Sequence, residues 1–182
     1  MNVPPLNPPI ATAARKPTLR FMLRHPAHAI ALAFGAGLSP AAPGTVGTLW
    51  AWLAFVLFRP VFDDAAWAIV MAASFAVGWW ACTLTARHLA TTDPGAVVWD
   101  EVVAFWLVLW LVMPASGWAQ GAAFVLFRIF DAAKPGPVAW ADKLFKSRRG
   151  QPIGWAQGFG ILLDDLVAAL CTLLVIALWR WW

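Results

Sequence analysis

Two long uncharged segments limit what this chain can fold into. Residues 65–86 contain no charged side chain over 22 positions, and residues 102–127 contain none over 26. A helix needs about 20 apolar residues to cross the hydrocarbon core of a bilayer. The whole chain is 62% hydrophobic and 12% charged, whereas a soluble domain is about 45–50% apolar and about 25% charged. We therefore expect an integral membrane protein with an all-α fold.

The second uncharged segment is interrupted in its middle by Pro114, Ser116 and Gly117. These residues favour a turn, so we expect two short helices forming a hairpin. Further apolar helices are expected at residues 27–38, 45–58, 65–86 and 161–179, with a polar connection over residues 132–158. Residues 1–18 contain four prolines and are expected to be a disordered tail, and residues 19–182 a single domain.

The basic residues indicate how the chain sits in a membrane. The net charge is +4, and the basic side chains flank apolar segments, which fits anionic lipid headgroups better than nucleic acid. Four Lys and Arg residues precede the first apolar segments, and five lie in residues 132–158. Because positive charge favours the cytoplasmic side, we expect both regions there. The two regions lie on the same side only if residues 102–127 form the hairpin. The same topology brings several acidic residues to the cytoplasmic boundary.

Acidic residues adjoin apolar helices at several points. Residues 98–103 read Val-Trp-Asp-Glu-Val-Val, and residues 161–167 read Ile-Leu-Leu-Asp-Asp-Leu-Val. A carboxylate within a membrane segment is costly without a partner, and Mg²⁺ is a suitable partner for carboxylates and a phosphate group. Alternatively, these acids pair with Arg and Lys or face solvent at helix starts. Adjacent helical residues point about 100° apart, so the two members of a pair need not do the same thing.

Arg128, Asp131 and Lys134 are spaced three residues apart, which places them on one face of a helix. One interpretation is a salt-bridged helix end. The other has Asp131 holding a metal ion while Arg128 or Lys134 binds phosphate oxygens.

Gly44, Thr45 and Thr48 lie in a loop that leads into an apolar helix, in the segment Pro-Gly-Thr-Val-Gly-Thr. Glycine lets a backbone approach a ligand closely, and the N–H groups at a helix start can bind an anion. The alternative is a plain connection between loop and helix.

Taken together, these segments resemble the phosphatidylglycerophosphatase A family. The resemblance rests on four motifs in order, at residues 35–49, 93–103, 128–137 and 158–169. It implies an all-helical fold of about six helices and a Mg²⁺-dependent hydrolase of phosphatidylglycerophosphate, in the bacterial inner membrane with its active site towards the cytoplasm. It also implies a metal and catalytic centre formed by five acids: Asp100, Glu101, Asp131, Asp164 and Asp165.

From the resemblance we expect the substrate and surrounding membrane lipids as binding partners, without an obligatory protein partner. Glu101 is the candidate general base, and Gly44, Thr45, Thr48, Arg128 and Lys134 are the candidate phosphate-binding residues. Three alternatives remain open: a Mg²⁺-dependent phosphatase for another lipid phosphate or phosphomonoester, a divalent-cation carrier, and a structural membrane subunit.

Overall fold

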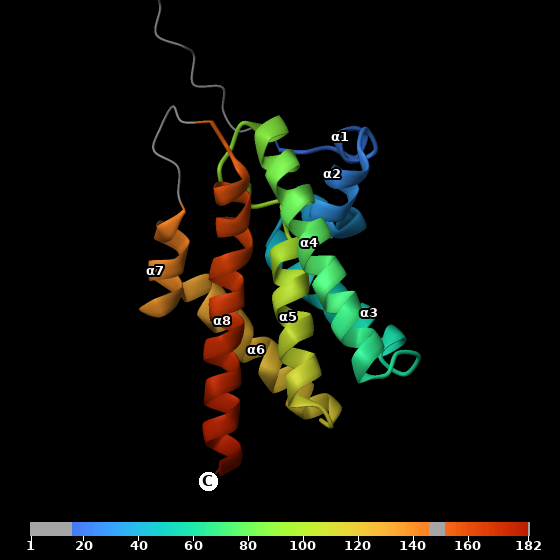
Figure 1. The fold of residues 1–182 in the computed structure, drawn as a ribbon, viewed down its shortest axis with the longest axis vertical. Coiled ribbons are helices and arrows are strands. Elements are labelled where there is room, and N and C mark those ends of the chain that lie inside the picture. The colour runs from blue at the N-terminus through green and yellow to red at the C-terminus, as the bar shows by residue number, and fades with distance from the viewer. Residues whose placement is uncertain (1–15, 146–151, 182) are drawn as a thin grey trace, which may run out of the picture.

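The computed structural model describes residues 16–145 and 152–181, and the regular secondary structure there is entirely helical (Figure 1). This confirms the predicted all-α fold. The elements are α1 (Leu19–Met22), α2 (Pro26–Ala31), the 3₁₀ helix η1 (Ala33–Leu38), α3 (Pro43–Phe58), α4 (Asp64–Leu89), α5 (Trp99–Val112), α6 (Gly117–Ala133), α7 (Pro137–Leu144) and α8 (Trp155–Trp181). Most of the expected tail lies outside the described residues, and the domain boundary at residue 19 stays a prediction.

Helix α5 is the centre of the fold. It packs against α8, α3, α4 and α6, and Phe105, Val108 and Leu109 on it are fully buried. Its 14 residues rise only about 21 Å, less than the roughly 30 Å hydrocarbon core of a bilayer. A helix this short is accommodated because its neighbours, rather than lipid, surround it.

Helices α4 and α8 are long and apolar enough to cross a membrane, judged by length and composition, with 26 and 27 residues respectively. Both also expose large apolar side chains, such as Ile69 on α4 and Leu174 and Leu178 on α8. Exposed apolar surface of this extent marks an interaction with a membrane or another protein. Together these features indicate that the chain is associated with a membrane.

The predicted hairpin is confirmed between α5 and α6. Helix α5 ends at Val112, and α6 begins at Gly117. Ser116 caps the start of α6, because its side chain accepts a hydrogen bond from the backbone N–H of Ala119. This hydroxyl satisfies one of the N–H groups that a helix start leaves unpaired.

The polar connection differs from the expectation. It contains α7, which begins at Pro137 and buries Val138 and Ala141, and α7 packs against α8. Helix α8 begins at Trp155, earlier than the predicted start at residue 161. Asp164 and Asp165 therefore lie about three turns inside α8 rather than at its end.

Candidate active site

Three carboxyl groups converge where α5 and α8 meet. Asp100 and Glu101 lie in the first turn of α5, and Asp165 comes from α8. One oxygen from each lies within 4.8 Å of the other two. The turn before α5 ends at Val98, whose backbone N–H donates to the Ala31 carbonyl at 2.9 Å. This bond joins the start of α5 to the end of α2.

One oxygen of each acid in this carboxylate cluster is buried and unpaired. Among the described residues, Asp100 Oδ1, Glu101 Oε2 and Asp165 Oδ2 have no hydrogen-bond partner. Glu101 is 9% exposed and Asp165 is 3% exposed. Burying an unpaired ionised oxygen costs several kcal/mol, so buried charges are paired or coordinate a metal. Three converging hard oxygens fit Mg²⁺, which prefers carboxylate ligands. The residues present therefore fit the metal ion that the family resemblance implies.

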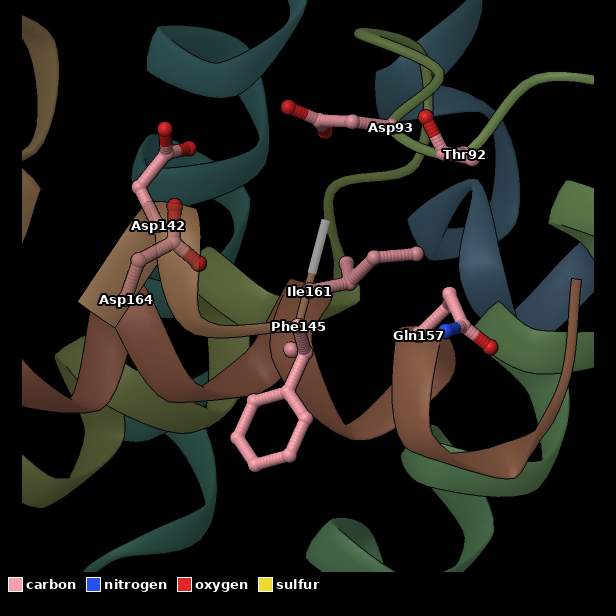
Figure 2. A pocket seen from close by; sticks show the side chains of 8 residues that line it. Thr92, Asp93, Asp142, Phe145, Gln157, Ile161 and Asp164 are labelled. Carbon is pink, nitrogen blue, oxygen red and sulfur yellow. The ribbon is translucent and has the colours of Figure 1, made fainter. Parts of the chain in front are cut away.

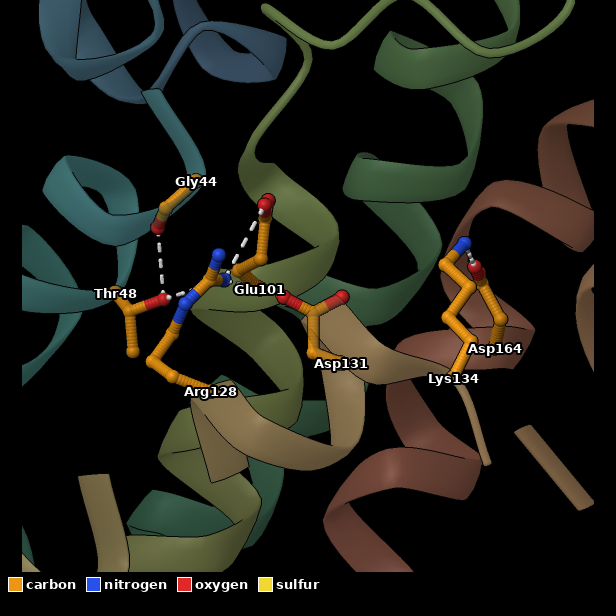
Figure 3. A network of polar contacts seen from close by, with 7 residues as sticks. All are labelled: Gly44, Thr48, Glu101, Arg128, Asp131, Lys134 and Asp164. Atoms are coloured by element: carbon orange, nitrogen blue, oxygen red, sulfur yellow. Dashed lines mark hydrogen bonds and ion pairs between the residues drawn. The ribbon is translucent and has the colours of Figure 1, made fainter. Parts of the chain in front are cut away.

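Arg128 joins the cluster to a fourth acid (Figure 3). Its Nη1 forms an ion pair with Asp131 Oδ2 and lies 3.7 Å from Glu101 Oε1. Both Arg128 and Asp131 lie in the last two turns of α6, so α6 brings one positive and one negative group to the cluster.

The start of α3 forms the opposite wall of this site. Gly44 is in the first turn of α3, and a Cβ built on it would collide with Glu101 Oε1 and lie 3.2 Å from both terminal nitrogens of Arg128. Only a glycine lets the backbone come this close. Thr45 follows it and is partly exposed. The first N–H groups of a helix have no partner within it, so this turn can bind an anion.

Thr48 is one turn further along α3 and is fully buried. Its hydroxyl donates to the Gly44 carbonyl at 2.8 Å and accepts a hydrogen bond from Arg128 Nη1 at 3.4 Å. The single hydroxyl proton is therefore used within the protein. Thr48 holds Arg128 beside Gly44, and its predicted contact with phosphate stays a prediction.

Lys134 and Asp164 form a second polar group beside the cluster. Lys134 Nζ lies 2.6 Å from Asp142 Oδ1 and 2.5 Å from Asp164 Oδ2. Figure 3 shows the Lys134–Asp164 pair apart from Arg128 and Asp131. Partial burial opposes the charged form of Lys134, but the hydrogen bonds to Asp142 and Asp164 outweigh it and raise the lysine pKa above its usual range. Lys134 thus stays protonated and links the end of α6 to α7 and α8.

Asp142 of α7 is a member of this group that sequence reasoning missed. Its signal in the sequence is weak, because it lies in a polar connection with several charged residues. A small cavity of about 20 Å³ opens beside Asp142 and Asp164 (Figure 2). Asp93 and Thr92 face the same cavity from the loop before α5. Its volume suffices for about one water molecule.

The predicted site residues are thus arranged in two neighbouring groups. The first contains Asp100, Glu101, Asp131 and Asp165 with Arg128, Gly44, Thr45 and Thr48, and the second contains Asp164 and Lys134 with Asp142. Adjacent residues Asp164 and Asp165 belong to different groups, as the 100° step of a helix allows.

A buried carboxylate cluster beside an arginine and a helix start, in a helical fold with membrane-length helices, defines a membrane-associated protein whose centre suits a divalent cation and an anionic group. Comparison with known proteins identifies the family. The family model for phosphatidylglycerophosphatase A matches residues 29–180. The chain therefore belongs to the phosphatidylglycerophosphatase A family, and it is an enzyme of the phosphatase class.

Individual relatives agree with the family match. The chain is similar to phosphatidylglycerophosphatase A of Escherichia coli (strain K12), with 34% identity over 83% of this chain and 81% of the relative. It is 33% identical to phosphatidylglycerophosphatase A of Haemophilus influenzae over 91% of this chain and 96% of the relative. A candidate phosphatidylinositol-3-phosphatase of Bacteroides thetaiotaomicron is 37% identical over 84% of this chain and 92% of its own length. No solved structure matches the chain.

Proposed function

We propose that the chain hydrolyses phosphatidylglycerophosphate to phosphatidylglycerol and phosphate, depends on Mg²⁺, and acts in phospholipid biosynthesis at the cytoplasmic face of a bacterial inner membrane. The substrate comes from the names of two relatives. The observation that carries the metal dependence is the set of three buried, unpaired oxygens on Asp100, Glu101 and Asp165.

Phosphoryl transfer needs positioned positive charge more than covalent chemistry. When bound at the carboxylate cluster, Mg²⁺ would neutralise charge on the phosphate and lower the pKa of a bound water molecule. The contacts of Arg128 with Glu101, Asp131 and Thr48 all use Nη1. A guanidinium group has five N–H donors, so Arg128 retains donors for the oxygens of a phosphate group.

The start of α3 completes the phosphate site. The backbone N–H groups of Gly44 and Thr45 are in the first turn of α3, where Gly44 lies beside Arg128, and would bind the same phosphate. Glu101 is suited to accept a proton from the attacking water, because its other oxygen, Oε1, lies on the side of Arg128 at 3.7 Å from Nη1 while Oε2 belongs to the cluster. Asp131 orients Arg128 through their ion pair. Lys134, held by Asp142 and Asp164, would stabilise the nearby negative charge without touching the substrate.

The test is phosphate release by the purified chain in detergent, with phosphatidylglycerophosphate as substrate and with Mg²⁺ or EDTA. We expect release with Mg²⁺ only. Asp165→Asn removes a cluster oxygen and should lower kcat/KM by about 100-fold or more. The matched variant Asp164→Asn weakens the contact with Lys134 but leaves the cluster intact, and we expect a smaller loss. Folded wild-type protein that releases no phosphate would overturn the proposal, and release in EDTA would overturn its metal dependence.

A second candidate substrate is a phosphoinositide, because one relative is a candidate phosphatidylinositol-3-phosphatase. The chemistry at the phosphate would be the same, and only the headgroup would differ. Parallel assays with phosphatidylinositol 3-phosphate decide between them. A higher kcat/KM for that lipid than for phosphatidylglycerophosphate would reverse the assignment of substrate.

A further inference from the structure

An apolar groove runs between α6 and α8 on the side of the molecule that leads away from the carboxylate cluster. Its volume is about 970 Å³. Figure 1 shows α6 crossing behind α8. The groove is lined by residues of α6 from Trp118 to Ile129 and by residues of α8 from Val175 to Arg180.

We propose that this groove binds one acyl chain of the lipid substrate, an inference that rests on the proposed function. The first reason is its position. Ile129 lines the inner end of the groove, and it is the neighbour in sequence of Arg128, which contacts the carboxylate cluster. A lipid whose phosphate lies at Arg128 therefore has an apolar channel within reach of its glycerol ester groups.

The length of the groove is the second reason. From Trp118 to Ile129 the lining follows 12 residues of α6, a rise of about 16 Å. This is about half of the roughly 30 Å hydrocarbon core of a bilayer, which is the depth that one acyl chain spans. The groove is thus about as long along α6 as one acyl chain, and its lining begins one residue from Arg128.

Composition is the third reason. Of the described residues that line the groove, only Arg180 is charged, and it lies at the end away from the cluster. Arg180 Nη2 donates to the Val112 carbonyl at 2.7 Å, which ties it to the end of α5. Ala119 and Ala122 form part of the wall on α6, and their small side chains leave the depth that a hydrocarbon chain occupies.

A lipid chain needs less room in the groove than a helix from a second copy. A helix with its side chains is about 10 Å across. An extended hydrocarbon chain is far narrower. Burial of its apolar surface would hold a hydrocarbon chain in the groove, and no second protein would be needed to fill it.

The experiment compares a groove-filling variant with a matched control. Ala122→Trp fills the groove from an exposed position on α6, and Ala76→Trp adds the same side chain to an exposed position on α4 that does not line it. Each is assayed with phosphatidylglycerophosphate carrying 16-carbon chains and with the dihexanoyl form, with KM given as a mole fraction in detergent micelles. Ala119→Phe is a second groove variant in case Ala122→Trp does not fold.

We expect Ala122→Trp to raise KM about tenfold for the long-chain substrate. This fold-change corresponds to about 1.4 kcal/mol, less than the burial of two methylene groups. KM for the dihexanoyl substrate, kcat, and all values of Ala76→Trp should stay near wild type. An equal change for both substrates, no change for either, or an altered oligomeric state with unchanged KM would overturn the inference. If wild-type protein hydrolyses neither substrate, the proposed function has failed instead.

Discussion

Gly44 is the position in the site where an added side chain would have the least room. A Cβ there would collide with Glu101 Oε1 and approach both terminal nitrogens of Arg128 at 3.2 Å. We predict that Gly44→Ala displaces these two side chains and lowers kcat/KM by about 100-fold, since a misplacement of about 1 Å in an active site has an effect of that size. The measurement is phosphate release with saturating Mg²⁺.

Gly95→Ala is the control for this prediction, because a Cβ at Gly95 has no neighbour within 4 Å. It should retain nearly full activity. Wild-type activity in a folded Gly44→Ala protein would mean that the close approach of α3 to Glu101 and Arg128 plays no part in the reaction.

Residue spacing predicted the members of the site better than their arrangement. The acids next to apolar helices were recognisable because an unpaired carboxylate there is costly, and three of them do converge. The expectation that Arg128, Asp131 and Lys134 share a helix face does not hold for Lys134. Helix α6 ends at Ala133, and Lys134 adopts a left-handed conformation with φ of 43°. Its side chain therefore departs from the helical spacing and reaches Asp142 and Asp164.

At the scale of elements, local signals located the hairpin but did not locate α7. The break between α5 and α6 is marked by turn-forming residues and a serine cap, which act locally. Helix α7 has only 8 residues, and a helix shorter than about 12–15 residues is marginal without tertiary packing. Its burial of Val138 and Ala141 depends on packing against α8, which the local sequence of α7 does not reveal. The early start of α8 likewise extends beyond the apolar pattern.

A histidine cluster joins α2 to α4, and it gives this junction a dependence on pH. His28 Nδ1 lies 2.8 Å from the Phe21 carbonyl, and its Nε2 lies 2.7 Å from His88 Nδ1. Since a carbonyl only accepts, Nδ1 of neutral His28 carries the proton and Nε2 accepts from His88. Burial lowers the pKa of His28 from 6.5, and the neighbouring His88 and His25 lower it further, against the opposing bond to Phe21.

A lowered pKa in the folded protein means that the unfolded chain binds more protons as the pH falls. The stabilising contribution of His28 is therefore present above pH 6.5 and is lost as the pH falls through the lowered value. We predict that the thermal midpoint of the wild type falls more between pH 7.5 and pH 5 than that of His28→Gln. Measurements of melting in detergent at several pH values test this. Equal slopes for the two proteins would show that His28 does not couple folding to pH.

At the scale of the whole molecule, the basic ends and the site lie towards one membrane surface under the proposed orientation. The exposed basic residues Arg20 and Arg24 are at α1, and Lys143 is on α7. Figure 1 places α1 and α2 at the end of the molecule opposite the turn between α3 and α4. Because Lys and Arg are retained on the cytoplasmic side, the end with α1 should face the cytoplasm and the α3–α4 turn the other side.

This orientation predicts where a membrane-impermeant maleimide can react. In a background with Cys82 and Cys171 replaced by Ala, Lys143→Cys should be labelled in inverted inner-membrane vesicles and protected in spheroplasts. Val61→Cys, which replaces a highly exposed residue of the α3–α4 turn, should show the reverse. If both positions were labelled from the same side, then either α3 and α4 or α5 and α6 would not cross the membrane as a pair of helices. The carboxylate cluster would then face whichever compartment labels Lys143→Cys, because its member Asp165 adjoins Asp164, which Lys134 links to Asp142 on α7.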